Sequence, residues 1–227
     1  MRVKDLIAEG ERISRPSILL SANGSGAVAA YWDGERIDEP NAVPPSATAI
    51  ESIRHVISVD ARLLPNLGVP VNFPAFSLFE TETKSGHVLY RVTRRDGLRL
   101  SDFRGECVPL YATPARSFPP IEAVCLYGGE VVSSWLKSHG LNRFQYLDAR
   151  ELPEALEYTD EYMRRCPLYL GNADAILGGW HQSWPVDDFY LPLEMRLALW
   201  TLRDAEPWLE AFFSLAGGGL SVRSRTT

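Results

Sequence analysis

Apolar residues near the start of the chain recur at helical spacing. Val3, Leu6 and Ile7 would share one face of a helix over residues 3–13. Gly10 would be the weak point of this helix, because glycine destabilises a helix interior. We therefore expect the chain to begin with a short amphipathic helix.

The apolar stretches that follow predict antiparallel strands. Residues 17–20 and 27–32 flank an Asn-Gly-Ser-Gly turn sequence, which predicts a hairpin. Residues 76–81 and 87–93 flank Lys-Ser-Gly and are rich in aromatic and β-branched residues, which makes them the clearest hairpin in the chain. The pattern over residues 49–64 fits either a helix or a strand.

Proline and turn residues predict three irregular segments. Residues 35–48 and 65–74 each contain three prolines and show little periodicity. Residues 96–120 carry turn residues throughout and end on Phe-Pro-Pro. We expect residues 1–227 to form a single domain, and a division into two lobes would fall near 96–120.

From Ile121 the pattern becomes more regular. It predicts a strand over 121–127, a helix over 130–138 that ends at Gly140, and a short strand over 144–147. A second helix is expected over 151–166. Asp148 is the candidate N-cap of that helix, Pro153 falls in its first turn, and Pro167 ends it.

The last fifty residues are expected to be mainly strands. Residues 175–177 and 193–203 have strand patterns. Residues 205–216 fit either a returning antiparallel strand or a helix, and the alternation over 220–225 favours strands. Together these elements predict an α+β fold with a largely antiparallel, strongly twisted sheet, two or three packed helices and a C-terminal lobe more regular than the N-terminal one.

Composition places the chain among globular proteins. Of its 227 residues, 45% are hydrophobic and 23% charged. The apolar start is interrupted by Glu9 and Glu11, so we expect no signal peptide and a soluble, cytoplasmic protein with no membrane association. The three cysteines, Cys107, Cys125 and Cys166, form no Cys-x-x-Cys pair, which is typical of free thiols in a reducing compartment.

The net charge of −6 argues against a nucleic-acid partner, since phosphate contacts require a basic surface. The acidity is uneven along the chain. Residues 1–113 hold 13 basic and 14 acidic groups, a net charge of −1, whereas residues 114–227 hold 10 and 15, a net charge of −5. A basic protein partner would therefore bind the C-terminal half.

Four glutamates give the predicted helix over 151–166 an acidic side. They are spaced three, three and four residues apart, and the stripe consists of Glu151, Glu154, Glu157 and Glu161. The apolar side would consist of Leu152, Leu156, Tyr162 and Met163. Few lysines or arginines are placed to neutralise the stripe; Arg165, four residues after Glu161, is one. Such a stripe is either a solvated surface or the binding site of a basic partner.

The segment over residues 178–188 is unusual in composition. Its chemistry-bearing residues are Trp180, His181, Gln182, Trp184, Asp187 and Asp188. The two tryptophans could anchor a protein partner. All six side chains could instead line a pocket for a small polar ligand. The segment could also be a structural loop whose tryptophans close the end of a sheet. One histidine beside two aspartates is a poor metal site.

Motifs for common chemistry are absent. The chain has no phosphate-binding loop, dinucleotide fingerprint, zinc-protease motif or nucleophile elbow, and no cofactor is expected. We therefore expect a non-enzymatic interaction protein, such as a bacterial immunity-type inhibitor or an adaptor, that binds a basic protein. Trp180 and Trp184 would join the glutamates in that surface. The alternatives are a small-ligand-binding domain or hydrolase using the Trp180–Asp188 loop, with His181 as general base, or a structural subunit of a larger complex.

Overall fold

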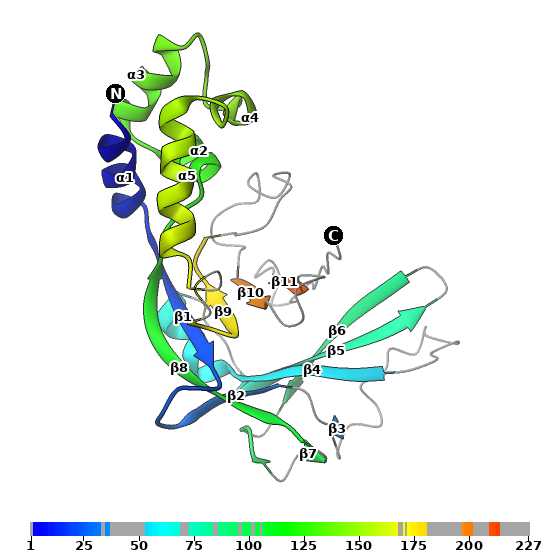
Figure 1. Cartoon of the computed structure of the whole chain (residues 1–227). Coiled ribbons are helices and arrows are strands. Elements are labelled where there is room, and N and C mark those ends of the chain that lie inside the picture. The colour runs from blue at the N-terminus through cyan, green and yellow to red at the C-terminus, as the bar shows by residue number, and fades with distance from the viewer. Residues whose placement is uncertain are drawn as a thin grey trace.

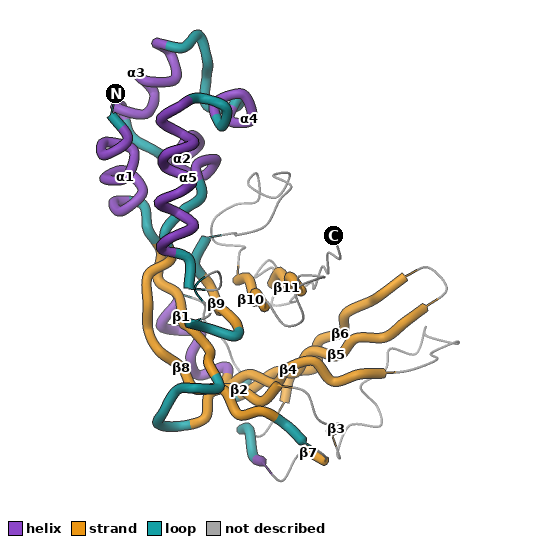
Figure 2. The backbone as a smooth tube through the Cα atoms, viewed as in Figure 1, coloured by secondary structure: helices purple, strands orange, loops and turns teal. Residues whose placement is uncertain are grey.

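Helices gather at one end of a long, curled sheet in the computed structural model of the chain (Figure 1). The structure describes residues 2–32, 35–36, 53–68, 73–83, 86–94, 97–100, 103–104, 106–167, 170, 172–180, 197–201 and 209–213. Within these residues the helical end and the strand-rich end are plainly separate regions (Figure 2). The predicted α+β class is confirmed.

The described strands form one nine-stranded sheet and one small ribbon. The large sheet contains β1 (Arg15–Ser21), β2 (Val28–Trp32), β4 (Ile53–Asp60), β5 (Ala75–Thr83), β6 (Gly86–Arg94), β8 (Val108–Ser117), β9 (Ala175–Gly178), β10 (Leu197–Thr201) and β11 (Leu209–Phe213). Its order is β11-β10-β9-β1-β8-β2-β4-β5-β6, and each of its strand pairs is antiparallel. The ribbon pairs β3 (Glu35–Arg36) with β7 (Phe103–Arg104).

The described helices come from the start and from the middle of the sequence. They are α1 (Val3–Arg12), α2 (Ile121–Tyr127), α3 (Glu130–Ser138), α4 (Tyr146–Ala149), α5 (Pro153–Arg165) and the 3-10 helix η1 (Ala61–Leu67). The helices predicted over 3–13, 130–138 and 151–166 are confirmed, but the last begins at Pro153, so Glu151 of the predicted stripe lies in the turn before it. Gly140 follows α3 with a φ of 72°, a left-handed conformation that suits glycine.

One predicted hairpin is confirmed and the other is wrong. β5 and β6 pair directly, and Thr83 lies opposite Gly86. β1 and β2 do not pair, because β8 lies between them and pairs with both. The turn sequence after β1 therefore joins two strands, β1 and β2, that are separated in the sheet by β8. The segment over 96–120 is also more regular than expected, since residues 108–117 form the long strand β8.

Two predicted strands in the second half are wrong. Residues 121–127 form α2, in which the five consecutive residues Ile121–Cys125 are all buried and leave no polar alternation to read. Residues 144–147 form a turn and the start of α4. Asp148 lies inside α4 and is not the N-cap of α5, which is Leu152; Pro153 does occupy the first turn of α5, as predicted.

The ambiguous segments resolve as strands. Residues 49–64 contain β4, which leads directly into η1, and the Asp60 carboxylate accepts a hydrogen bond from the Arg62 backbone N–H at the start of η1. Residues 209–213 return antiparallel to β10, as the strand alternative predicted. The rest of 193–225 lies outside the described residues. The greater regularity expected of the C-terminal lobe therefore stays a prediction.

Each end of the molecule has its own apolar core. The core of the sheet centres on residues such as Leu20, Ile57 and Phe76, which are fully buried. The helical core centres on Leu6, Trp135 and other residues of α1–α5. The chain passes between the two regions after α1, after β8 and after α5. The possible division near 96–120 coincides with the second crossing, and the single domain over 1–227 stays a prediction.

Candidate protein-binding surface

The buried side of α5 is made of small and aromatic residues. Ala155, Tyr158 and Tyr162 are buried in the helical core. The Tyr158 hydroxyl donates a 2.8 Å hydrogen bond to the Pro119 carbonyl, so its polar group is satisfied in the core. The Tyr158 ring also stacks on Phe118, with centroids 5.3 Å apart.

Leu156 and Met163 do not supply the apolar side of α5 as predicted. Leu156 is 54% exposed and Met163 is 41% exposed. Apolar spacing suggested that they would pack inward, but the tyrosines occupy the core because their rings are large and the Tyr158 hydroxyl has a partner. Two apolar side chains are therefore left on the solvent side.

The exposed positions of α5 combine apolar, acidic and basic residues. Leu156, Glu157, Asp160 and Met163 are all exposed and fall within about a third of the helix circumference, which they share with the exposed Arg164, an ion-pair partner of Glu161. We call these four residues the outer face of α5. Five of the seven large apolar side chains that are exposed among the described residues come from residues 144–170, so exposed apolar groups concentrate around this helix.

The predicted acidic stripe differs in charge between its two ends. At the C-terminal end, Glu161 lies 2.6 Å from the Arg165 guanidinium and 3.6 Å from that of Arg164. Arg165 also reaches Glu11 of α1 at 2.9 Å. Among the described residues, no lysine or arginine lies within ion-pair distance of Glu151, Glu154 or Glu157. The uncompensated charge is therefore at the N-terminal end.

The chain just before and along α5 is strongly acidic. Residues 148–161 hold six acidic groups and one basic group, Arg150. The Arg150 guanidinium lies 3.9 Å from the buried Glu122 carboxylate of α2, so this cation is directed at the core. Acidic residues near a helix N-terminus are favoured by the helix dipole, which accounts for part of the pattern without a partner. The exposed apolar residues beside them have no such explanation.

Burial perturbs two groups in α2 beneath this surface. Burial raises the pKa of the Glu122 carboxyl, and Arg150 lowers it in part. Burial and the neighbouring Glu122 raise the pKa of the Cys125 thiol to about 12. Cys125 is therefore protonated and unreactive at neutral pH. None of the three cysteines, all within the described residues, forms a disulfide bond.

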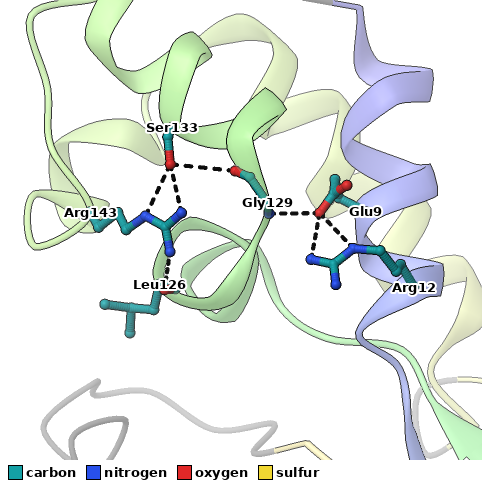
Figure 3. Close-up of polar contacts among 6 residues, drawn as sticks. All are labelled: Glu9, Arg12, Leu126, Gly129, Ser133 and Arg143. Carbon is teal, nitrogen blue, oxygen red and sulfur yellow. Dashed lines mark hydrogen bonds and ion pairs between the residues drawn. The ribbon is translucent and has the colours of Figure 1, made fainter.

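A polar network fixes the junction between α2 and α3 (Figure 3). From one side, the Glu9 carboxylate of α1 accepts a 2.8 Å hydrogen bond from the Gly129 N–H and is held by Arg12. From the other side, Arg143 donates hydrogen bonds of 2.6 and 3.1 Å to the Ser133 hydroxyl and one of 3.2 Å to the Leu126 carbonyl. Sequence reasoning missed this network, because its members are far apart in the chain.

Comparison with known proteins does not assign the chain to a family. No protein-family model matches the chain, and a search of curated proteins finds no match.

Trp180 is a core residue, which removes it from the expected binding surface. Its side chain is 2% exposed, and the indole N–H donates a 2.9 Å hydrogen bond to the Ile13 carbonyl. The backbone N–H of Trp180 donates to the Ser117 hydroxyl at 3.0 Å, and the Arg15 guanidinium lies 3.4 Å from the ring centre. The other residues singled out in this segment lie outside the described residues: His181, Gln182, Trp184, Asp187 and Asp188.

The structure also brings together a histidine and two serines that sequence reasoning did not connect. His55 Nε2 lies 2.8 Å from the Ser58 hydroxyl, and Ser58 lies 2.6 Å from the Ser77 hydroxyl across β4 and β5. Both serines are 0% exposed and His55 is 4% exposed. Such a chain satisfies buried polar groups, and in this conformation its hydroxyls are closed to a substrate.

The described part of the chain offers neither a metal centre nor a membrane span. No group of three histidine, cysteine, aspartate or glutamate side chains is arranged to hold a metal ion within these residues. None of the helices in the described ranges combines the length and apolar character needed to cross a membrane.

Proposed function

We propose that this chain is a non-enzymatic interaction protein that binds a basic protein through the outer face of α5 and the acidic turn before it. An inhibitor of the kind that immunity proteins represent, or an adaptor, would work in this way. The observation that carries the proposal is the exposure of Leu156 and Met163 beside the uncompensated carboxylates of Glu157 and Asp160. Apolar groups supply contact area, and the carboxylates attract and orient a basic partner.

The surface has the rigidity that a binding site needs. α5 is held against α1 by the Arg165–Glu11 ion pair and against the segment before α2 by the Tyr158–Pro119 hydrogen bond. Neither contact uses a residue of the outer face. The outer face can therefore be altered without disturbing the packing of the helix, which makes the proposal directly testable.

The test is affinity capture from the cells in which the protein occurs, followed by titration with the recovered partner. The test variant is Glu157→Lys/Asp160→Lys. The matched control is Glu106→Lys/Glu130→Lys, which changes the net charge equally at two other exposed positions. We expect a basic protein to bind the wild type and the control alike, and to bind the test variant at least about tenfold more weakly, or about 1.4 kcal/mol.

The salt dependence of binding provides a second readout. Raising the ionic strength from about 0.05 to about 0.3 M should weaken binding to the wild type, because exposed charge pairs are screened. The test variant should show a smaller dependence. Equal affinity for the test and control variants, or failure to capture any protein partner, would overturn the proposal.

A further inference from the structure

We propose that the partner segment received by the outer face of α5 is a basic amphipathic helix, an inference that rests on the proposed function. Leu156 and Met163 are seven residues apart, which places them on one line along α5 and separates them by about 10 Å. Anchors at this spacing are the usual contacts of a helix that docks against another helix or groove. The partner would place its own apolar side over this pair.

The spacing favours a helix over an extended segment. A second helix presents apolar residues at positions i and i+7, which are also about 10 Å apart. Side chains on one face of a strand repeat at about 6.6 or 13 Å, because a strand rises about 3.3 Å per residue and alternates its faces. A strand lying along α5 would therefore bring only one apolar side chain into register with Leu156 and Met163.

The charges beside the apolar pair define the flanks of the partner helix. Glu157 and Asp160 are exposed on one side of the Leu156–Met163 line, and Arg164 on the same side forms its ion pair with Glu161. Neither carboxylate forms an ion pair within the described residues. Lysine or arginine residues beside the apolar side of the partner would complement them. The same charges argue against an anionic lipid surface, which these carboxylates would repel.

The probe is a 14-residue peptide of leucine and lysine, capped at both ends, with leucines at helical spacing on one face. The control peptide has the same composition in an order that places its leucines around the whole helix. Binding to the full chain is measured by fluorescence anisotropy at about 0.15 M salt, and peptide helicity by circular dichroism. We expect the patterned peptide to bind at least about tenfold more tightly than the control peptide and to gain helicity on binding.

Two protein variants locate the contact. Leu156→Ala/Met163→Ala should weaken binding of the patterned peptide by at least about tenfold. Leu100→Ala removes the same side chain as Leu156→Ala at a position that is 62% exposed, outside the helical region, and should leave binding unchanged. Because Leu156 and Met163 are exposed, their truncation leaves the core intact, and an unchanged far-ultraviolet spectrum verifies this.

The outcomes separate the two proposals. If both peptides bind equally, and only Glu157→Lys/Asp160→Lys weakens them, the helical partner is rejected while a basic partner stands. If the patterned peptide binds wild type and Leu156→Ala/Met163→Ala alike, the outer face is not its site and the inference fails. If neither peptide binds, the inference also fails, and capture of a basic protein decides the proposed function independently.

Discussion

At the scale of single residues, Glu122 is the least favourable placement in the helical region. Its side chain is almost fully buried, and its nearest cation, Arg150, is 3.9 Å away. Burial penalises the charged form, so the pKa of Glu122 is raised above the ordinary value of 4.5. The folded protein therefore holds a proton on this carboxyl to a higher pH than the unfolded chain does.

Glu122 should make the stability fall as the pH rises. With a raised pKa, its contribution is fully present below the unfolded pKa and is lost as the pH rises through the folded pKa. Glu122→Gln removes that loss, so we expect it to raise the free energy of unfolding at pH 7 by about 1 kcal/mol and to leave it nearly unchanged at about pH 4.

Urea unfolding between pH 4 and 8 measures this difference. Glu130→Gln, at an exposed position in the first turn of α3, is the control and should change stability little at either pH. A lower stability of Glu122→Gln at pH 7 would mean that the attraction to Arg150 outweighs the cost of burial.

Gly10 was singled out correctly in the sequence of α1, but for the wrong reason. Propensity marks it as the weak point of α1. In the structure it is buried, and a Cβ atom built there would lie 2.8 Å from the Phe118 ring and against the Tyr158 hydroxyl. Glycine is therefore required by the approach of residues more than a hundred positions away, which local sequence does not reveal.

At the scale of elements, α3 depends on α1 for its start. Gly129 is the N-cap residue of α3 and has no side chain to cap the helix, and the Glu9 carboxylate accepts its N–H hydrogen bond instead. The hydrogen bond from Arg12 is the largest cause that lowers the pKa of Glu9. A long-range carboxylate thus accepts the N–H of the N-cap residue, as the Glu or Gln at position N3 does in a capping box.

Glu9→Ala should destabilise the protein in a pH-dependent way. With a lowered pKa, Glu9 contributes stability above the unfolded pKa of about 4.5 and loses it as the pH falls through the folded pKa. We expect a loss of about 1 kcal/mol at pH 7, as for removal of a helix cap, and a smaller loss below about pH 4.

Thermal unfolding monitored by circular dichroism at both pH values tests this. Lys4→Ala, an exposed position in the same helix, is the control and should be nearly neutral. Equal losses for Glu9→Ala at pH 7 and at low pH would show that the carboxylate charge is not the stabilising feature.

Elements defined by local signals were predictable from the sequence, and those defined by distant pairing were not. The β5–β6 hairpin has its turn and both strands in one stretch, and it was predicted correctly. The β1–β2 hairpin failed because β8, some eighty residues further along the chain, pairs between them. α2 was predicted as a strand because a short run whose first five residues are all buried has no clear periodicity.

The candidate surface was likewise predictable where it depends on local sequence and not where it depends on distant contacts. The spacing of Glu154, Glu157 and Glu161 on a helix could be read from the sequence, since it depends only on helical geometry. Which side of α5 faces the core could be read only in part, since Tyr162 is buried as predicted but Leu156 and Met163 are exposed. Leu156 was assigned to the core, and its exposure is what now distinguishes the outer face from an ordinary acidic surface.

At the scale of the whole molecule, Trp180 joins the two regions. Its ring belongs to the helical core and lies 5.5 Å from that of Tyr127, while its backbone lies two residues after Gly178, the last residue of β9. Its hydrogen bonds reach Ile13, just before the sheet begins at β1, and Ser117, the last residue of β8. Trp180 thus contacts the chain close to the first crossing through its side chain and close to the second through its backbone N–H, and it lies near the third itself.

Trp180→Ala should therefore uncouple the helical region from the sheet. Removing a buried tryptophan costs about 3–5 kcal/mol, and here the cavity lies where the two regions meet. Each region keeps its own core, so we expect amide hydrogen exchange to accelerate in α3 and α5 more than in β1 and β4. Phe76→Ala, a large truncation inside the core of the sheet, is the control and should show the opposite bias. Equal loss of protection in both regions for Trp180→Ala would mean that the two cores unfold as one cooperative unit. The prediction that Trp180 couples two separately stable regions would then be wrong.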